Sequence, residues 1–139
     1  MPIERKLAAI MFTDIAGYTA LSAKDSTKAS GLLKTQRDTL KPIVEKHGGS
    51  WMKEMGDGLL LTFDSATSAV ECSIAIQVST NDIEDLNLRI GVHEGEVIMQ
   101  DGDVIGDDVN VASRIEPFSA IGGVAISKSS ASYIKQSRI

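Results

Sequence analysis

The chain lacks several features that define common protein classes. It contains one cysteine, Cys72, which excludes an internal disulfide and favours a reducing compartment. No apolar run approaches the roughly 18 residues of a membrane span, and no signal-peptide hydrophobic region opens the chain. Repeats and low-complexity tracts are absent from the sequence. A net charge of −5 gives no basic surface of the kind that nucleic acid requires, so we expect no nucleic-acid partner.

The apolar pattern indicates one mixed domain. The length of 139 residues and the 42% of hydrophobic residues suit a single globular core. The pattern predicts, in chain order, a strand 5–13, a helix 26–47, strands 50–55 and 59–63, a helix from 64 or 65, strands 86–95 and 96–100, a helix 107–115, a strand 124–127 and a helix from 129. This order predicts an α+β fold with a ferredoxin-like βαββαβ (palm-like) core, an antiparallel sheet with helices on one face.

Asp14 ends the first apolar strand and is followed by small residues. A carboxylate at the end of a buried strand is costly unless a cation or donors compensate it. The turn 15–19 would leave backbone N–H groups uncovered before a helix, and such groups suit a polyphosphate. The alternative is that Asp14 only caps the following helix.

Asp57 lies between Gly56 and Gly58 in a tight hairpin signal. Alone, it reads as an ordinary turn aspartate. In the predicted core, however, the first strand and this hairpin are neighbours, so Asp14 and Asp57 would converge. Two carboxylates would make an oxygen-rich seat for divalent cations, and two cations held close can organise a phosphoryl transfer.

Asn110 and Arg114 are four residues apart and share a face of the predicted helix 107–115. An amide and a guanidinium on one face suit positioning of a ribose and stabilisation of phosphate charge. The alternative is a solvated polar face. His47 and His93 have no partner at metal-ligand spacing and are predicted to be structural, and Cys72 is predicted to be a core residue.

Four segments together resemble the class III nucleotidyl cyclase catalytic domain, in the order and spacing of that family. They are Phe-Thr-Asp-Ile-Ala-Gly-Tyr-Thr (12–19), Lys-Glu-Met-Gly-Asp-Gly (53–58), Arg-Ile-Gly-Val-His-Glu-Gly-Glu (89–96) and Val-Asn-Val-Ala-Ser-Arg (109–114). The resemblance implies that residues 1–139 form a cyclase homology domain. It also implies that Asp14, Asp57 and the backbone of Ile15 hold two Mg²⁺ or Mn²⁺ ions per site. The backbone of Ile15, Ala16, Gly17, Tyr18 and Thr19 would cradle the triphosphate, Asn110 would orient the ribose, and Arg114 would stabilise charge on the α-phosphate.

The resemblance also bears on the base. Lys53 and Asp103 stand where adenylyl cyclases of this family carry lysine and aspartate, whereas guanylyl cyclases typically carry glutamate and cysteine. Lysine would donate to an adenine ring nitrogen and aspartate would accept from the adenine amino group. This favours ATP as substrate and 3′,5′-cyclic AMP and pyrophosphate as products. Without the resemblance, Lys53 would be an exposed strand residue and Asp103 a turn residue.

Family members are dimers whose active sites span the interface, so the resemblance implies a homodimer and an inactive monomer. Regulatory domains on a longer parent chain and a cytoplasmic location are expected, with any membrane attachment supplied elsewhere in the parent. The family domain continues into a hairpin whose lysine contacts the terminal phosphates; nothing after Arg138 supplies it. The missing hairpin leaves open a truncated or degenerate cyclase-like module that dimerises or binds nucleotide without turnover. A guanylyl cyclase is a second alternative. A diguanylate cyclase is a third, but this sequence does not contain the Gly-Gly-Asp/Glu-Glu-Phe signature of that class.

Overall fold

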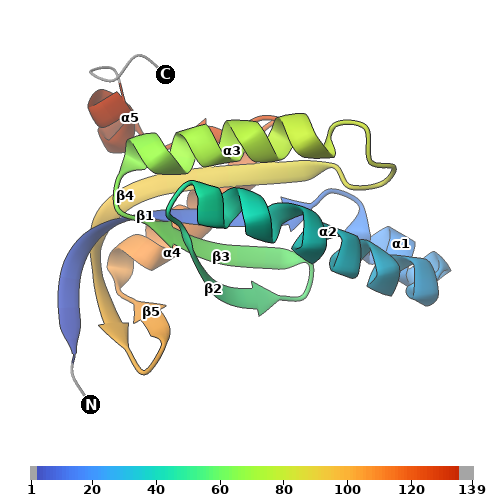
Figure 1. Cartoon of the computed structure of the whole chain (residues 1–139), viewed down its shortest axis with the longest axis horizontal. Helices are drawn as coiled ribbons and strands as arrows, with labels where there is room; N and C mark the ends of the chain where they lie inside the picture. The colour runs from blue at the N-terminus through green and yellow to red at the C-terminus, as the bar shows by residue number, and fades with distance from the viewer. Residues whose placement is uncertain (1–2, 135–139) are drawn as a thin grey trace.

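The structure is a computed structural model that describes residues 3–134. Its elements in chain order are β1 (Glu4–Ile15), α1 (Tyr18–Lys24), α2 (Ser26–Lys46), β2 (Ser50–Met55), β3 (Gly58–Phe63), α3 (Ala66–Thr80), β4 (Leu88–Gln100), β5 (Asp103–Ile105), α4 (Asp107–Ile115), the 3₁₀ helix η1 (Glu116–Phe118), β6 (Ala125–Ile126) and α5 (Lys128–Ile134) (Figure 1). Arg138, on which the expectation of a missing hairpin rests, lies outside the described residues.

The sheet confirms the predicted α+β class. Its strands run in the order β2-β3-β1-β4-β5, and each neighbouring pair is antiparallel. The short strand β6 departs from this pattern because it pairs with β4 in parallel. The central pair β1–β4 runs without a register break from Glu4↔Met99 to Ile15↔Leu88. The prediction of two separate strands, 86–95 and 96–100, is therefore wrong: the glycine at position 95 continues the ladder instead of ending it.

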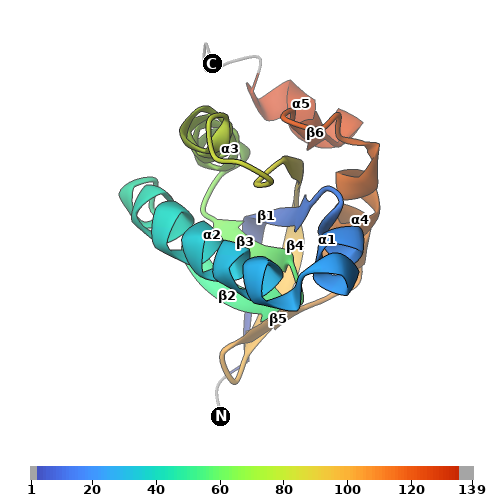
Figure 2. The same ribbon diagram turned by 90° about the vertical axis from the view of Figure 1, so that its right-hand side faces the viewer.

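Alternating side chains of β1 bury into two clusters on opposite faces of the sheet. Ala9 and Met11 pack with residues of α2 and α3, whereas Ala8 and Ile10 pack with Ala112 of α4. Figure 2 shows α4 on the side of the sheet away from α2 and α3. The expectation that the helices lie on one face is thus wrong for α4.

Helix α3 begins beside the predicted start at 64 or 65. Ser65 caps it by accepting a hydrogen bond from the Ser68 N–H. Its buried stripe runs through Ala69, Cys72, Ser73 and Ile76, whereas Ile74 is 46% exposed. Cys72 is a core residue as predicted, and burial raises the pKa of its thiol to about 12.

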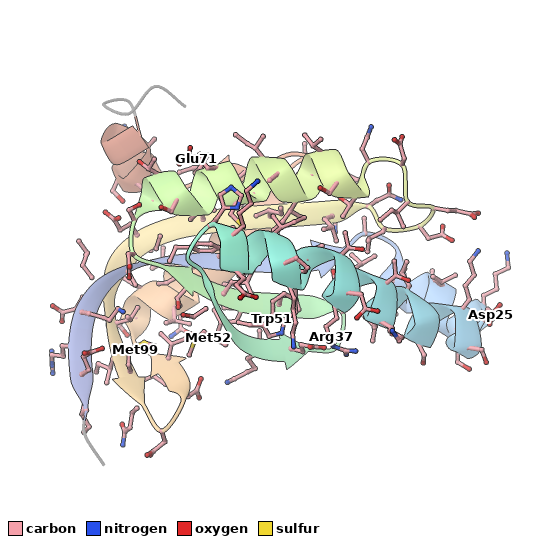
Figure 3. The ribbon with its side chains drawn as sticks, viewed as in Figure 1. Asp25, Arg37, Trp51, Met52, Glu71 and Met99 are labelled. Atoms are coloured by element: carbon pink, nitrogen blue, oxygen red, sulfur yellow. The ribbon has the colours of Figure 1, made fainter. Side chains whose placement is uncertain are left out.

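An ion pair fixes the edge strand β2 to helix α2. The Arg37 guanidinium donates from Nε and Nη2 to the two carboxylate oxygens of Glu54, at 2.8 Å each. The Trp51 indole N–H donates to the same carboxylate at 3.2 Å, and Figure 3 shows Arg37 and Trp51 together between α2 and β2. The Arg37 contact holds the pKa of Glu54 below its usual value. These contacts of Glu54 fix the position of β2, the strand that carries Lys53.

No helix within residues 3–134 is both long and apolar enough to cross a bilayer.

Candidate active site

The end of β1 and the turn between β2 and β3 meet at the two predicted aspartates. Asp14 and Asp57 line one cavity of about 450 Å³, together with Arg89 and residues of the turn before α1. The Ile15 N–H donates to Oδ2 of Asp57 at 2.9 Å, and the buried Gln36 amide donates to the Asp57 backbone carbonyl at 3.3 Å. Asp57 is therefore held by both β1 and α2, which is more than a turn residue requires.

Asp14 does not cap the following helix. The N-cap of α1 is Gly17, with φ of 78° and no side-chain cap hydrogen bond. Instead, Oδ1 of Asp14 accepts a hydrogen bond from Nη1 of Arg89 at 3.0 Å, across the β1–β4 ladder where the two residues are paired. The helix-cap alternative is therefore excluded.

A buried carboxyl that the sequence did not point to adjoins this pair. Glu116 begins η1 and is 8% exposed. Burial, assisted by Asp14, raises the pKa of Glu116 to about 8, while Arg89 opposes the shift. Its Oε2 has no hydrogen-bond partner among the described residues. Arg89 could have been found only from the β1–β4 register, and Glu116 only from how η1 packs, since both approach Asp14 from distant parts of the chain.

The oxygen donors at this cavity fit a divalent cation that arrives with a nucleotide. Two carboxylates and the backbone at Ile15 are hard oxygen donors, and Mg²⁺ is commonly bound by one or two carboxylates plus substrate phosphates. Within residues 3–134 no group of three His, Cys, Asp or Glu side chains is arranged to hold a metal by itself. A cation here would depend on Asp14, Asp57 and the substrate together.

The predicted phosphate cradle is narrower than expected. The Ile15 N–H is donated to Asp57, and the Ala16 N–H is donated to the Asn87 carbonyl at 2.7 Å. These two amides are therefore not offered to a phosphate in this structure. The amides that remain for a phosphate begin at Gly17 and continue into the first turn of α1, at Tyr18 and Thr19, where helical N–H groups have no partner within the helix.

A second cavity gathers the residues expected at the base and ribose. Nζ of Lys53 lies 3.2 Å from Oδ1 of Asp103, and the Val104 N–H donates to the same carboxylate at 2.8 Å. These contacts, the backbone N–H first, lower the pKa of Asp103. Lys53, Asp103 and Asn110 line a cavity of about 470 Å³ with apolar walls that include Phe12. A paired donor and acceptor between apolar walls suits a purine base.

The two cavities are separate but face the same way. They share no lining residue, and Arg114 lines neither of them. Phe12 of the second cavity and Asp14 of the first lie two residues apart on β1 and so point to the same face of the sheet. That face also carries α4, on which Asn110 and Arg114 are exposed. One chain thus carries both sets of residues on one face of its sheet.

An antiparallel sheet that brings two aspartates together beside the turn before α1 suits a metal-assisted phosphoryl transfer. The family model described as the adenylate and guanylate cyclase catalytic domain matches residues 4–139. The chain belongs to this family.

Two kinds of relative support the assignment. A protein of Rhizobium meliloti (strain 1021) named "Putative adenylate cyclase 3" is 40% identical over 140 residues, which cover 95% of this chain and 24% of that protein. The adenylate/guanylate cyclase/hydrolase of Silicibacter pomeroyi superposes with a TM-score of 0.88 at 35% identity, covering 99% of this chain and 84% of that one. The chain spans less than a third of the length of the curated relatives it matches.

A third relative has been solved both as a monomer and as a non-canonical dimer. It is the guanylyl cyclase domain of the RhoGC fusion protein from Blastocladiella emersonii. It superposes with a TM-score of 0.86 at 25% identity and covers 96% of this chain and 86% of that one.

Proposed function

We propose that this chain is the catalytic domain of an adenylyl cyclase, which converts ATP to 3′,5′-cyclic AMP and pyrophosphate at sites shared by two copies of the chain. The observation that carries the proposal is the separation of the two half-sites. The acid pair and the Lys53–Asp103–Asn110 cavity lie on one face but share no lining residue. A second copy, placed face to face by a two-fold axis, would complete two equivalent sites.

The acid pair and the turn after it would hold the triphosphate end. Asp14 and Asp57 would bind Mg²⁺ or Mn²⁺, two ions per site, with the backbone at Ile15. When bound, the cations would neutralise phosphate charge and favour ionisation of the ribose 3′-hydroxyl. The amides from Gly17 to Thr19 would contact the phosphates.

Helix α4 of the other copy would act on the ribose and the reacting phosphorus. The Asn110 amide would orient the ribose so that its 3′-oxygen faces the α-phosphorus in line with the leaving pyrophosphate. The Arg114 guanidinium would stabilise the charge that develops on the α-phosphate oxygens. Both side chains are exposed in the single chain, which leaves them available to a nucleotide bound by its partner.

The Lys53–Asp103 pair favours adenine. Adenine presents an acceptor ring nitrogen beside a donor amino group, and a cation and a carboxylate 3.2 Å apart match that order. Guanine presents a donor ring nitrogen beside an acceptor carbonyl and would meet two mismatched contacts, with a large loss of binding. The relative from Rhizobium meliloti carries a name of the adenylate type, in agreement with this choice.

Replacing Asp57 with Asn tests the proposal. Asn keeps an acceptor for the Ile15 N–H, so the fold and the dimer should persist, whereas loss of the charge should lower cyclic AMP formation at least about a hundredfold. The matched control is Glu71→Gln on α3, an exposed carboxylate on the opposite face, whose activity should equal that of the wild type. Full turnover in Asp57→Asn would contradict the metal assignment.

Two rivals give other results in the same assay. A module that binds nucleotide without turnover would yield no cyclic nucleotide from the wild type, and a guanylyl cyclase would turn over GTP in preference to ATP. Regulatory domains on a longer parent chain are part of the proposal, since the matched residues make up 24%, 15% and 30% of three curated relatives.

A further inference from the structure

His93 of β4 joins three elements through a buried hydrogen-bond network. Its side chain is 7% exposed. Nδ1 lies 2.7 Å from the hydroxyl of Ser127, just before α5, and Nε2 lies 2.8 Å from Oδ1 of Asp108, the second residue of α4. The Ser127 hydroxyl is 2.7 Å from that of Ser130, which accepts the Glu94 N–H at 2.7 Å. The ring therefore stands between β4, α4 and the start of α5.

The chemistry of the carboxylate assigns the proton on the ring. An ionised Asp108 can only accept, so Nε2 carries the hydrogen and donates it to Oδ1. The other oxygen of Asp108 accepts the Glu96 N–H at 3.0 Å. A Cβ at Gly95 would overlap the Asp108 carboxyl group, so the glycine leaves the space that this carboxylate occupies. Asp108 is thus held to β4 at His93, Gly95 and Glu96.

Apolar packing anchors α4 at Ala112 and Val109. Of the nine residues of the helix, Ala112 is fully buried, and the partly buried Val109 packs against the same cluster. Its N-cap, Gly106, has no side chain with which to cap it. Asn110 and Arg114 lie two and six residues after Asp108 on the same helix, so a shift of this carboxylate would move both side chains.

We propose that His93 is a positioning residue for the cyclase reaction: by holding Asp108 it sets the placement of α4, and with it Asn110 and Arg114. This rests on the proposed function. His93 lines neither of the two cavities, so it acts through α4 and not on the nucleotide. The Ser127–His93–Asp108 arrangement has the residue types of a hydrolytic triad, but Ser127 is 7% exposed and lines neither cavity, which makes its role structural.

Two substitutions separate the two bonds of the ring. A Gln amide reaches the position of Nε2, so His93→Gln keeps a donor for Asp108, whereas His93→Asn reaches only the position of Nδ1. We expect kcat to fall about tenfold or more in His93→Asn, because the Asp108 carboxylate, whose side chain is 36% exposed, loses its ring donor and keeps only the Glu96 N–H. KM for ATP should stay within about twofold. In His93→Gln we expect kcat within about threefold of the wild type. Equal kcat in both variants and the wild type would overturn the proposal.

Mixed dimers then show which half-site carries the defect. Two variants with different affinity tags are co-expressed and purified through both tags. In a dimer of Asp14→Asn with His93→Asn, one site combines an intact acid pair with an intact α4, so about half the wild-type rate should return. In a dimer of Arg114→Ala with His93→Asn, the remaining site uses the α4 of the His93→Asn chain, and the rate should stay about tenfold lower. A merely structural defect would slow both mixed dimers alike, and that result would overturn the proposal.

A third mixed dimer separates this inference from the proposed function. Asp14→Asn with Arg114→Ala leaves one intact site only if sites are shared, so recovery of about half the wild-type rate is expected. No recovery there would overturn the shared-site function itself. Should His93→Asn fail to fold, Asp108→Asn replaces it in the same series, since it weakens the same bond from the other side. Suppose that the Asp14→Asn with Arg114→Ala dimer recovers activity but the Asp14→Asn with Asp108→Asn dimer does not. This result would contradict the role of His93 and leave the shared-site function standing.

Discussion

Glu116 is the residue whose acid–base behaviour departs most from its ordinary range. It places a buried carboxyl beside Asp14, and Arg89 from β4 is the cation that faces both. With its pKa raised to about 8, Glu116 is protonated at neutral pH and adds no second negative charge next to Asp14. In the metal-free chain, Asp14 thus has a neutral neighbour at neutral pH.

This shift has a measurable effect on stability. The folded pKa of Glu116 exceeds its ordinary value of 4.5, so the folded chain binds more protons, and stability is lost as pH rises from about 5 through 8. Glu116→Gln imitates the protonated form and removes that loss. In metal-free buffer, the free energy of unfolding of the wild type should therefore fall relative to the variant, by up to about 1 kcal/mol per pH unit. Urea unfolding at four pH values measures it; parallel curves would contradict the shift.

If Lys53 and Asp103 select the base, as proposed, replacing both should change the preferred nucleotide. Because Lys53 and Asp103 form an ion pair, Lys53→Glu alone would place two carboxylates together and should lower turnover of both nucleotides. With Asp103→Cys added, the ratio of kcat/KM for GTP over ATP should rise at least about a hundredfold. Steady-state assays with each nucleotide measure the ratio. An unchanged preference for ATP would show that the base is bound elsewhere.

At the residue scale, the sequence allowed candidate site residues to be identified where they follow a strand or lie one helix turn apart. Asp14 and Asp57 could be paired because the strand order made their elements neighbours. Arg89 and Glu116 could not be assigned, because their approach to Asp14 depends on the β1–β4 register and on how η1 packs. The sequence also could not predict that the Ile15 and Ala16 N–H groups donate to Asp57 and Asn87, since these hydrogen bonds depend on tertiary contacts.

At the scale of elements, the backbone of η1 packs directly against Gly91 of β4, so that a side chain at this position would clash with it. A Cβ at Gly91 would lie 2.5 Å from both N and Cα of Glu116. Gly91→Ala must therefore displace η1, and we expect a loss of about 1–3 kcal/mol in the free energy of unfolding, measured with urea. The control is Gly31→Ala inside α2, where no atom lies within 4 Å of the added Cβ and stability should stay or rise by up to about 1 kcal/mol. Equal stability of the two variants would contradict the packing.

The elements that were predicted well are long or strongly patterned. Strand 50–55 and helix 107–115 were predicted with the observed bounds, and helix 26–47 differs by one residue at its end. The errors have physical reasons. The short α1 and β5 have too few residues to show a hydrophobic period. The sequence predicted that Gly95 ends a strand, but it lies within β4, where its missing side chain makes room for Asp108. The face of α4 could not be read from its own residues, because it is set by the path of the chain.

At the scale of the whole molecule, the proposed function depends on two cavities that share no lining residue. Each chain carries the acid pair and the α4 residues on one face, but in separate cavities. A single chain would therefore bind the phosphates of one nucleotide and the base of another. Turnover should require that two copies meet, so the activity of this domain would be controlled by whatever brings two copies together.

The most direct test is the rate of cyclic AMP formation from ATP and Mn²⁺ across a series of protein concentrations, with GTP in parallel. A rate per chain that rises with concentration toward a plateau is the predicted result, with cyclic AMP exceeding cyclic GMP, because the site forms only in the dimer. A rate per chain that is constant down to concentrations at which sizing shows only monomer would contradict the shared site.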